Sequence, residues 1–194
     1  IDSLGFSVNG KLLEIESTSN DSLVVVVNEP EYNVCPVCGY ATEEKLPKNH
    51  KNPYGYDCKN RDVGSKKYIL SHDFKTDVAK IVFKTPESAD NATMLSVLYA
   101  LLEGTSSALD IERTDIKGTL HKVNWNGQLI YSIILYDAVA GGAGHVRRLA
   151  TKDGAAFQRV LRAAYDLVRN CDCDSSCYKC LRNYYNQKIH EKLD

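Results

Sequence analysis

Alternation of apolar and polar residues in the first part of the chain predicts β-strands. The segment GFSVNGKLLEIE, residues 5–16, alternates on both sides of Asn9 and Gly10. Asn-Gly supplies the positive φ angles of a tight turn, so the two halves of this segment are predicted to form a hairpin. Further strands are predicted at residues 23–27 and 76–83, where apolar and β-branched residues recur.

Helical spacing of apolar residues predicts three helices. The first covers residues 88–103 and keeps Leu95, Leu98 and Leu102 on one face. The second covers residues 157–168, and the third covers residues 181–193. The third rests on an apolar residue at every fourth position, namely Leu181, Tyr185, Ile189 and Leu193.

A second set of strands is predicted between the first two helices. It starts with SALDIE, residues 107–112, and continues through GTLHKVNWNGQLIYSIILYDA, residues 118–138. Asn126-Gly127 joins two runs of β-forming residues there, so a second hairpin is predicted. The predicted fold class is α+β, with antiparallel hairpins and a central sheet packed by helices.

The composition changes between residues 33 and 67, where Gly, Pro, Asn, Lys and Cys replace the apolar pattern. Such a segment cannot build an apolar core, so it is predicted to be a loop-rich insert that resembles a zinc knuckle. The predicted organisation is an N-terminal region of strands with this insert, residues 1–67, followed by an α+β domain, residues 68–194.

Composition and charge narrow the class of protein. The 194 residues are 43% hydrophobic, and the formal net charge is −1, so nucleic acid would have to bind a local patch. No run of about 18 apolar residues and no signal-like leader is present, so a cytoplasmic location is expected. The only methionine is Met94, so we expect the chain to be a piece of a longer polypeptide.

Seven cysteines fall into two groups, and the second group is CDCDSSCYKC, residues 171–180. Clustered thiols in a chain without an export signal are typical of metal ligands. Four thiolates suit tetrahedral Zn²⁺ and leave no open position, so the sequence predicts a structural zinc site that joins the last two predicted helices. An iron–sulfur cluster is the main alternative, and a disulfide or redox dithiol is the second. The predicted ligands are Cys171, Cys173, Cys177 and Cys180.

The first group begins with CPVCG, a tight turn that presents Cys35 and Cys38, and Cys58 follows. A fourth ligand is needed, and His50 is the nearest candidate, because neutral imidazole completes Cys₃His sites. His72 is the second choice. The alternative is a degenerate knuckle that lacks a ligand, with Arg61 standing where a last cysteine would be.

A glycine-rich turn, Gly141-Gly142-Ala143-Gly144, precedes a predicted helix that carries Arg147 and Arg148. Such a turn exposes N–H groups that can bind a phosphate, although the pattern is neither of the standard phosphate-loop motifs. The alternative is a tight turn where the helix packs closely on the sheet.

Basic residues of the last third are candidates for contact with nucleic acid. Arg159, Arg162 and Arg169 share one face of a predicted helix, opposite its apolar face. The last predicted helix adds Arg182, Asn183, Asn186, Gln187 and His190, and Tyr178, Tyr184 and Tyr185 could stack on bases. A solvated helix face is the alternative. The predicted DNA-contacting residues are Arg147, Arg148, Arg159, Arg162 and Arg182.

Acidic residues permit a second function, a metal-dependent nuclease. Glu103, Asp110, Glu112, Asp115 and Lys117 surround a transition from helix to strand, and such groups can hold Mg²⁺ for phosphodiester cleavage. The spacing is not a nuclease signature, and ordinary acids of turns and strand ends explain it as well. No catalytic residue is assigned.

Four segments together resemble the MrfA-type zinc-binding domain. They are YILSHDFKTDVAKIVF, LLEGTSSALDIERTDIKGTL, ILYDAVAGGAGHV and CDCDSSCYKCLRNYYNQKIHEKLD, and the resemblance covers residues 68–194. This module is found at the C-terminus of MrfA-like DExH-box DNA repair helicases and in DISARM phage-defence proteins. The resemblance implies that the four cysteines of 171–180 are zinc ligands, and that CPVCG belongs to a second zinc element.

The resemblance also implies an accessory role in an ATP-dependent DNA helicase, in DNA repair or phage defence. Phosphate-binding motor loops and a DExH box are absent from these residues. We therefore expect no enzymatic activity from this fragment alone, with DNA and the helicase motor domains as partners and no membrane. The motor would lie upstream or on another chain. A purely protein-binding module is a further alternative.

Overall fold

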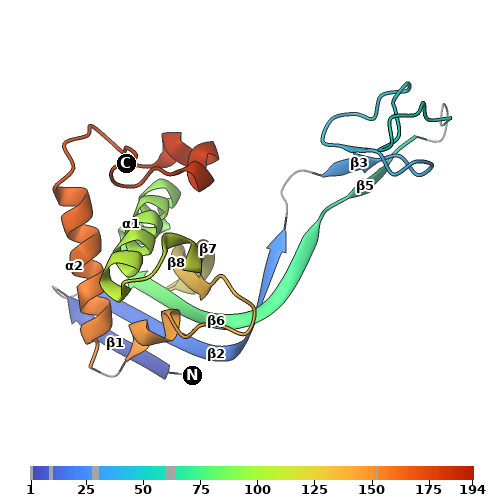
Figure 1. Cartoon of the computed structure of the whole chain (residues 1–194). Helices are drawn as coiled ribbons and strands as arrows, with labels where there is room; N and C mark the ends of the chain where they lie inside the picture. The colour runs from blue at the N-terminus through green and yellow to red at the C-terminus, as the bar shows by residue number, and fades with distance from the viewer. Residues whose placement is uncertain (1, 9–10, 28–30, 60–63, 152) are drawn as a thin grey trace. The chain divides into compact units, whose positions relative to one another are not determined.

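The computed structural model describes residues 2–8, 11–27, 31–59, 64–151 and 153–194. Contacts divide the chain into two compact units, which are unit 1 (Ile1–Leu23 with Lys75–Asp194) and unit 2 (Val24–Phe74). Figure 1 shows the elements of both. This division does not coincide with the predicted one at residues 67 and 68, because the N-terminal strands join the same sheet as strands from the second half of the chain.

Unit 1 is built on a five-stranded sheet with the order β1-β2-β6-β8-β7. Its strands are β1 (Asp2–Val8), β2 (Lys11–Val27), β6 (Ser71–Lys84), β7 (Ile116–Trp125) and β8 (Gln128–Asp137). The predicted N-terminal hairpin is confirmed, since β1 and β2 pair antiparallel and Val8 lies opposite Lys11. Its turn residues, Asn9 and Gly10, lie outside the described residues. The strand predicted at 23–27 is the end of β2.

The second predicted hairpin is also confirmed. Strands β7 and β8 pair antiparallel from Ile116 opposite Asp137 to Trp125 opposite Gln128. Asn126 and Gly127 join them with φ angles of 50° and 81°, the pair of positive values that a type I′ turn requires. The N–H group of Gly127 donates to the side-chain oxygen of Asn124 at 3.0 Å, which fixes the turn locally.

Helix α1 (Asn91–Leu109) begins after the short 3₁₀ helix η1 (Pro86–Ala89). Asp90 caps α1, because its carboxylate accepts the N–H group of Thr93 at 2.7 Å. The helix was predicted from residue 88. The residues before Asp90 instead form η1, because a helix with Asp90 as its N-cap cannot extend further back.

The prediction of a strand at SALDIE was wrong. Residues 107–109 are the last residues of α1, which ends where Asp110 adopts the left-handed conformation with φ 54°. Asp is one of the few residues that tolerate this conformation. The next residues, Arg113–Asp115, form the 3₁₀ helix η2, and β7 starts only at Ile116.

The two α-helices of unit 1 cover one face of the sheet (Figure 1). Helix α2 (Ala155–Arg169) packs closely on α1, because Gly104 of α1 has no side chain to separate it from Val160 and Ala164 of α2. The core of unit 1 lies between the helices and the sheet. Its fully buried residues include Ile81, Leu101, Ile133 and Phe157.

The chain after residue 181 does not form the predicted helix. The structure has a 3₁₀ helix, η4 (Tyr184–Lys192), with a break in its dihedral angles at Asn186. Leu181 and Leu193 are buried as predicted, but the side chain of Tyr185 is 80% exposed. The side chains of Asn183 and Asn186 bond to backbone groups here, and such bonds compete with a regular α-helix.

Unit 2 contains a small sheet with the order β4-β3-β5. Its strands are short: β3 (Tyr32–Val34), β4 (Ala41–Thr42) and β5 (Lys66–Tyr68). Turns and irregular segments connect them, so the predicted loop-rich insert has only a little regular structure.

Candidate metal centres

The four C-terminal cysteines meet beyond the end of α2. Cys171 and Cys173 follow the last turn of that helix, and the Cys177-x-x-Cys180 turn brings the other two thiols back to them. Their four sulfur atoms all lie within 4.8 Å of one another. The loop was predicted to bring these four residues together, and the structure does so.

The sulfur separations fit a single tetrahedral ion. Four sulfurs at about 2.3 Å from a tetrahedral Zn²⁺ lie about 3.8 Å apart. The structure gives 3.5 Å for Cys171 to Cys173 and for Cys171 to Cys177, 3.7 Å for Cys173 to Cys180, and 3.8 Å for Cys177 to Cys180. A disulfide needs about 2.05 Å. An iron–sulfur cluster distributes its cysteines over several iron atoms and holds them wider apart, so this geometry favours one ion.

Backbone N–H groups donate hydrogen bonds to both sulfurs of the Cys177-x-x-Cys180 turn, and such bonds favour the thiolate form that binds a metal. The N–H group of Lys179 donates to Cys177 Sγ at 3.3 Å, and this bond lowers the pKa of Cys177 to about 7. The N–H group of Cys177 donates to Cys180 Sγ at 3.2 Å. In contrast, the hydrogen bond with the Cys171 thiol, together with desolvation, favours the protonated form of Cys173 and raises its pKa to about 12. A bound divalent cation would stabilise the thiolate of Cys173 and so allow the thiol to lose its proton.

The C-terminal site rests on a second apolar cluster of unit 1. Cys180, Leu181 and Leu193 are buried together, and residues of α1, including Leu95 and Tyr99, pack against them. Ser176 is buried and donates to the carbonyl of Leu193 at 2.7 Å. The N–H group of Asp194 donates to Ser96 Oγ of α1 at 2.9 Å. The cysteine loop therefore fixes the end of the chain on α1.

Asn183, Asn186 and His190 support the site rather than face a ligand. Asn186 is 2% exposed, and its amide donates to the carbonyl of Leu181 at 2.8 Å. His190 Nε2 lies 2.8 Å from Asn186 Oδ1, and its ring meets Tyr178 edge-on. The prediction that Asn186 contacts phosphate is therefore corrected. Sequence reasoning missed the roles of Ser176 and Asn186, because only their burial reveals them.

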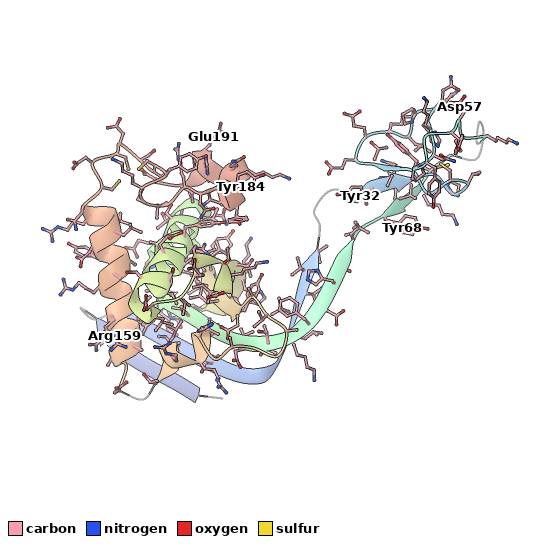
Figure 2. All side chains as sticks on the ribbon, viewed as in Figure 1. Tyr32, Asp57, Tyr68, Arg159, Tyr184 and Glu191 are labelled. Atoms are coloured by element: carbon pink, nitrogen blue, oxygen red, sulfur yellow. The ribbon has the colours of Figure 1, made fainter. Side chains whose placement is uncertain are left out.

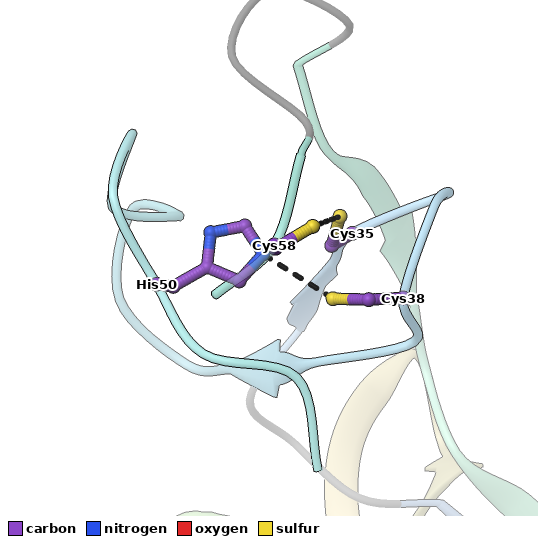
Figure 3. A group of neighbouring side chains, drawn as sticks. All are labelled: Cys35, Cys38, His50 and Cys58. Atoms are coloured by element: carbon purple, nitrogen blue, oxygen red, sulfur yellow. Dashed lines mark hydrogen bonds between the residues drawn. The ribbon is translucent and has the colours of Figure 1, made fainter. Parts of the chain in front are cut away.

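The second group lies in unit 2 and consists of Cys35, Cys38, His50 and Cys58 (Figure 3). All four ligand atoms again lie within 4.8 Å of one another. Cys35 Sγ lies 3.8 Å from Cys58 Sγ, and Cys38 Sγ lies 3.3 Å from His50 Nε2. The structure thus brings together the four residues that the sequence analysis preferred. His72, the second choice, stacks on Phe74 instead.

The glycine-rich turn does not offer its N–H groups to an external anion. Asp137 accepts the N–H groups of Ala143 at 2.7 Å and of His145 and Val146 at 3.1 Å. Asp77 accepts the N–H group of Gly144 at 2.9 Å. Both carboxylates are buried, so they occupy the place that a phosphate would take. The phosphate hypothesis is corrected, and the turn is a close contact with the sheet, as in the alternative.

The predicted DNA-contacting arginines differ in their surroundings. Arg148, Arg159 and Arg162 are exposed, and Figure 2 shows Arg159 on α2. Arg147 is half-exposed and lies 3.8 Å from the carboxylate of Asp77. Arg182 is partly buried and donates to Ser176 at 2.9 Å, next to the cysteine site. Arg159 and Arg162 also border a surface groove between α1 and α2, which Glu103 and Asp166 share.

The acidic residues of the nuclease hypothesis have separate structural partners. Glu103 pairs with Arg113 at 2.9 Å, and Glu112 and Asp115 cap η2 reciprocally. Asp110 terminates α1. Within the described part of the chain, groups of three or more potential ligand residues occur only at the two cysteine sites. These carboxylates therefore do not form a common metal site.

A family of known proteins matches the segment that contains the C-terminal cysteines. Residues 97–181 match the family model of the MrfA Zn-binding domain. The resemblance inferred from the sequence is thereby confirmed for this segment. The matched segment includes Cys171, Cys173, Cys177 and Cys180, so the four-thiol group lies inside the part of the chain that is similar to this zinc-binding domain.

Two larger proteins are also similar to the chain. It is 27% identical over 214 aligned residues to the Druantia protein DruE of Escherichia coli (strain UMEA 4076-1), an alignment that covers 97% of the chain and 11% of DruE. The DUF1998 helicase MrfA, in a crystal structure bound to DNA, shares the fold with a TM-score of 0.54 and 17% identity over 93% of the chain. The chain covers 21% of that protein. No helix in the described residues could cross a membrane.

Proposed function

We propose that the chain contains a zinc-binding accessory domain of a DNA helicase or of a helicase-associated protein. The observation that carries this proposal is the four-thiol group of residues 171–180, whose tetrahedral spacing lies inside the segment that matches the MrfA Zn-binding domain. The ion is Zn²⁺, which four thiolates bind strongly and without an open coordination position. Its role is structural.

The accessory role is supported by the fold shared with MrfA, which was crystallised with DNA. The similar region covers about a fifth of the length of that helicase, so in this proposal the motor would lie outside residues 1–194 or on another chain. In this proposal the domain belongs to a cytoplasmic DNA repair or phage-defence system. It supports DNA binding or the docking of a partner, and it does not hydrolyse ATP or DNA itself.

DNA would meet the surface of unit 1 that carries Arg159 and Arg162. Both side chains are exposed on α2 and lie three positions apart, so they point to the same side of the helix. With a net charge of −1, the chain has no general attraction for DNA, so a small number of arginines would dominate binding.

The experiment measures DNA affinity as a function of salt, with single-stranded and duplex oligonucleotides. We expect Arg159→Ala with Arg162→Ala to weaken binding and to reduce the slope of log K against log salt by between one and two. The reason is that each phosphate contact contributes roughly 0.7 to 0.9 to that slope. Zinc content is measured on the same samples.

The matched control is Lys117→Ala with Lys122→Ala, which removes two exposed positive charges from β7. This control should retain the salt slope. An equal loss in both variants would indicate a general charge effect and contradict the assigned surface. Zinc without measurable DNA affinity would favour a purely protein-binding module.

A further inference from the structure

Unit 2 has almost no apolar core. Among its described residues, 24–27, 31–59 and 64–74, one side chain is buried, and that side chain is Cys35, at 1% exposure. Large apolar side chains are instead exposed, including Tyr54 at 85% and Tyr56 at 73%. A segment of this size without a core needs a metal, a disulfide or a partner to fold.

Backbone pairing cannot replace the missing core. The strands β3, β4 and β5 contain three, two and three residues. Sheets of such short strands without an apolar face are not independently stable in water. None of the cysteines of unit 2 takes part in a disulfide, so no such bond closes the segment either. Its stability must come from another interaction.

Both halves of unit 2 carry their ligands on turns that are closed by hydrogen bonds. In the first turn, the N–H group of Cys35 donates to the carbonyl of Tyr40 at 2.8 Å, and Gly39 N–H returns to the carbonyl of Cys35 at 2.9 Å. In the second, Cys58 N–H donates to the carbonyl of His50 at 3.0 Å. Each turn thus holds two of the four ligands at a fixed separation.

His50 has the ring orientation of a metal ligand. Its Nδ1 lies 2.8 Å from the carbonyl oxygen of Pro47, an atom that can only accept. Nδ1 is therefore the nitrogen that donates to this carbonyl, and Nε2, which lies 3.3 Å from Cys38 Sγ, is the nitrogen placed to bind a metal. The ring of Tyr40 stacks on the imidazole at 5.1 Å and holds it there. A carbonyl that fixes the tautomer in this way is typical of zinc-bound histidine.

We propose that Cys35, Cys38, His50 and Cys58 bind a second zinc ion, and that this ion is what folds unit 2. Zinc at about 2.3 Å from sulfur and about 2.0 Å from nitrogen separates a sulfur from a nitrogen by about 3.6 Å and two sulfurs by about 3.8 Å. The structure has 3.3 Å for Cys38 to His50 and 3.8 Å for Cys35 to Cys58. Three thiolates and one imidazole fill the tetrahedron, so the site is structural.

The second site is independent of the first. It lies outside residues 97–181, the segment that matches the zinc-binding family, and in a different compact unit. Unit 1 has its own apolar core and does not need the ion of unit 2. Loss of the second zinc should therefore unfold residues 31–59 and leave unit 1 folded.

The test counts zinc by elemental analysis of the whole chain, after loading with zinc and removal of unbound metal. We expect two equivalents for the unchanged protein and one for Cys58→Ser. His50→Cys should keep two, because a fourth thiolate can replace imidazole in the same tetrahedron. The matched control, His72→Ala, removes an exposed histidine of the same unit and should also keep two.

Hydrogen exchange on the same proteins locates the effect. In Cys58→Ser, the amides of residues 31–59 should lose protection, while those of β7 and β8 should keep it. Two equivalents of zinc in Cys58→Ser, or one in the unchanged protein, would overturn the proposal. Unchanged protection of residues 31–59 in a one-zinc variant would overturn the folding role. The proposed function is tested separately, since Cys177→Ser removes the other ion.

If Cys58→Ser does not accumulate as soluble protein, the unchanged chain is titrated with Co²⁺ in place of zinc. Two successive tetrahedral cobalt spectra are expected, with weaker sulfur-to-cobalt absorption for the site with three thiolates than for the site with four. A single spectrum that saturates at one equivalent would contradict the second site.

Discussion

At the scale of single residues, Asp137 has the most consequential contacts outside the cysteine sites. It is fully buried at the end of β8, and its two carboxylate oxygens accept three backbone N–H groups of the glycine-rich turn. Thr76 donates to the carbonyls of Asp137 and Val139, both at 2.9 Å, and so holds the start of this turn against β6. Hydrogen bonds to a buried charge are strong, so these contacts fix the turn on the sheet.

Replacing Asp137 should therefore destabilise unit 1. We expect Asp137→Asn to lower the free energy of unfolding by about 2–4 kcal/mol, because the negative charge is lost and the amide NH₂ group, which cannot accept, replaces one of the two accepting oxygens. Chemical denaturation followed by circular dichroism measures the effect. Asp166→Asn, which removes the same charge from an exposed position of α2, should change stability by about 0.5 kcal/mol or less. Equal effects of the two variants would contradict the role of Asp137.

Gly142 shows why this turn needs glycine. Its φ angle is +71°, a conformation that favours glycine, and a Cβ atom there would collide with the Asp77 carboxylate. The turn was predicted to bind an external phosphate, but its N–H groups bind the carboxylates of Asp137 and Asp77. Asp77 is distant in sequence from the turn, whereas Asp137 lies just before it, and the burial that directs both carboxylates into the turn could not be read from the motif.

At the scale of elements, the contact between α1 and α2 depends on a single small residue. A Cβ atom at Gly104 would lie 2.7 Å from the carbonyl oxygen of Val160 and 2.9 Å from the Cβ atom of Ala164. Separations this short do not occur in relaxed structures, so the helices would have to move apart. The helical pattern predicted both elements but not their separation.

Gly104→Ala tests this contact against helix propensity. Alanine should gain up to about 1 kcal/mol from propensity in α1, whereas overpacking costs about 1–3 kcal/mol. We expect a net loss of stability, visible as a lower midpoint in thermal or denaturant unfolding. Ser107→Ala, at an exposed position of the same helix, should be neutral or slightly stabilising. A stabilised Gly104→Ala protein would show that the helices are not in close contact.

At the scale of the whole molecule, stability comes from a different source in each unit. Unit 1 has a continuous apolar core between its sheet and helices, and a smaller cluster beneath the C-terminal cysteines. Unit 2 has one buried residue among those described and, in our proposal, an ion. Metal binding free energy is folding free energy in such sites, so metal removal should affect the parts of the chain unequally.

Cys177→Ser should release one zinc ion and unfold only the C-terminal segment of the chain. Residues 171–194 depend on the site and its apolar cluster, so their amides should lose protection from hydrogen exchange, while β7 and β8 remain protected. Elemental analysis and exchange followed by mass spectrometry measure the two effects. Ser175→Ala, an exposed position in the same loop, should retain the metal and the protection. Undiminished zinc in Cys177→Ser would contradict the C-terminal site.

The sequence by itself determined the two hairpins, most of the helix of residues 155–169 and the membership of the two groups of side chains that the structure brings together. These depend on local signals: the Asn-Gly turn at residues 126 and 127, the helical period, and the spacing of cysteines in each group. Only the tertiary structure decided that β1 and β2 join the same sheet as β6, β7 and β8. It further decided that Asp77 and Asp137 accept the backbone N–H groups of the glycine-rich turn. It also decided that the last segment is a 3₁₀ helix around a buried Asn186. These features depend on contacts between residues far apart in the chain, or on burial, and no local pattern encodes them.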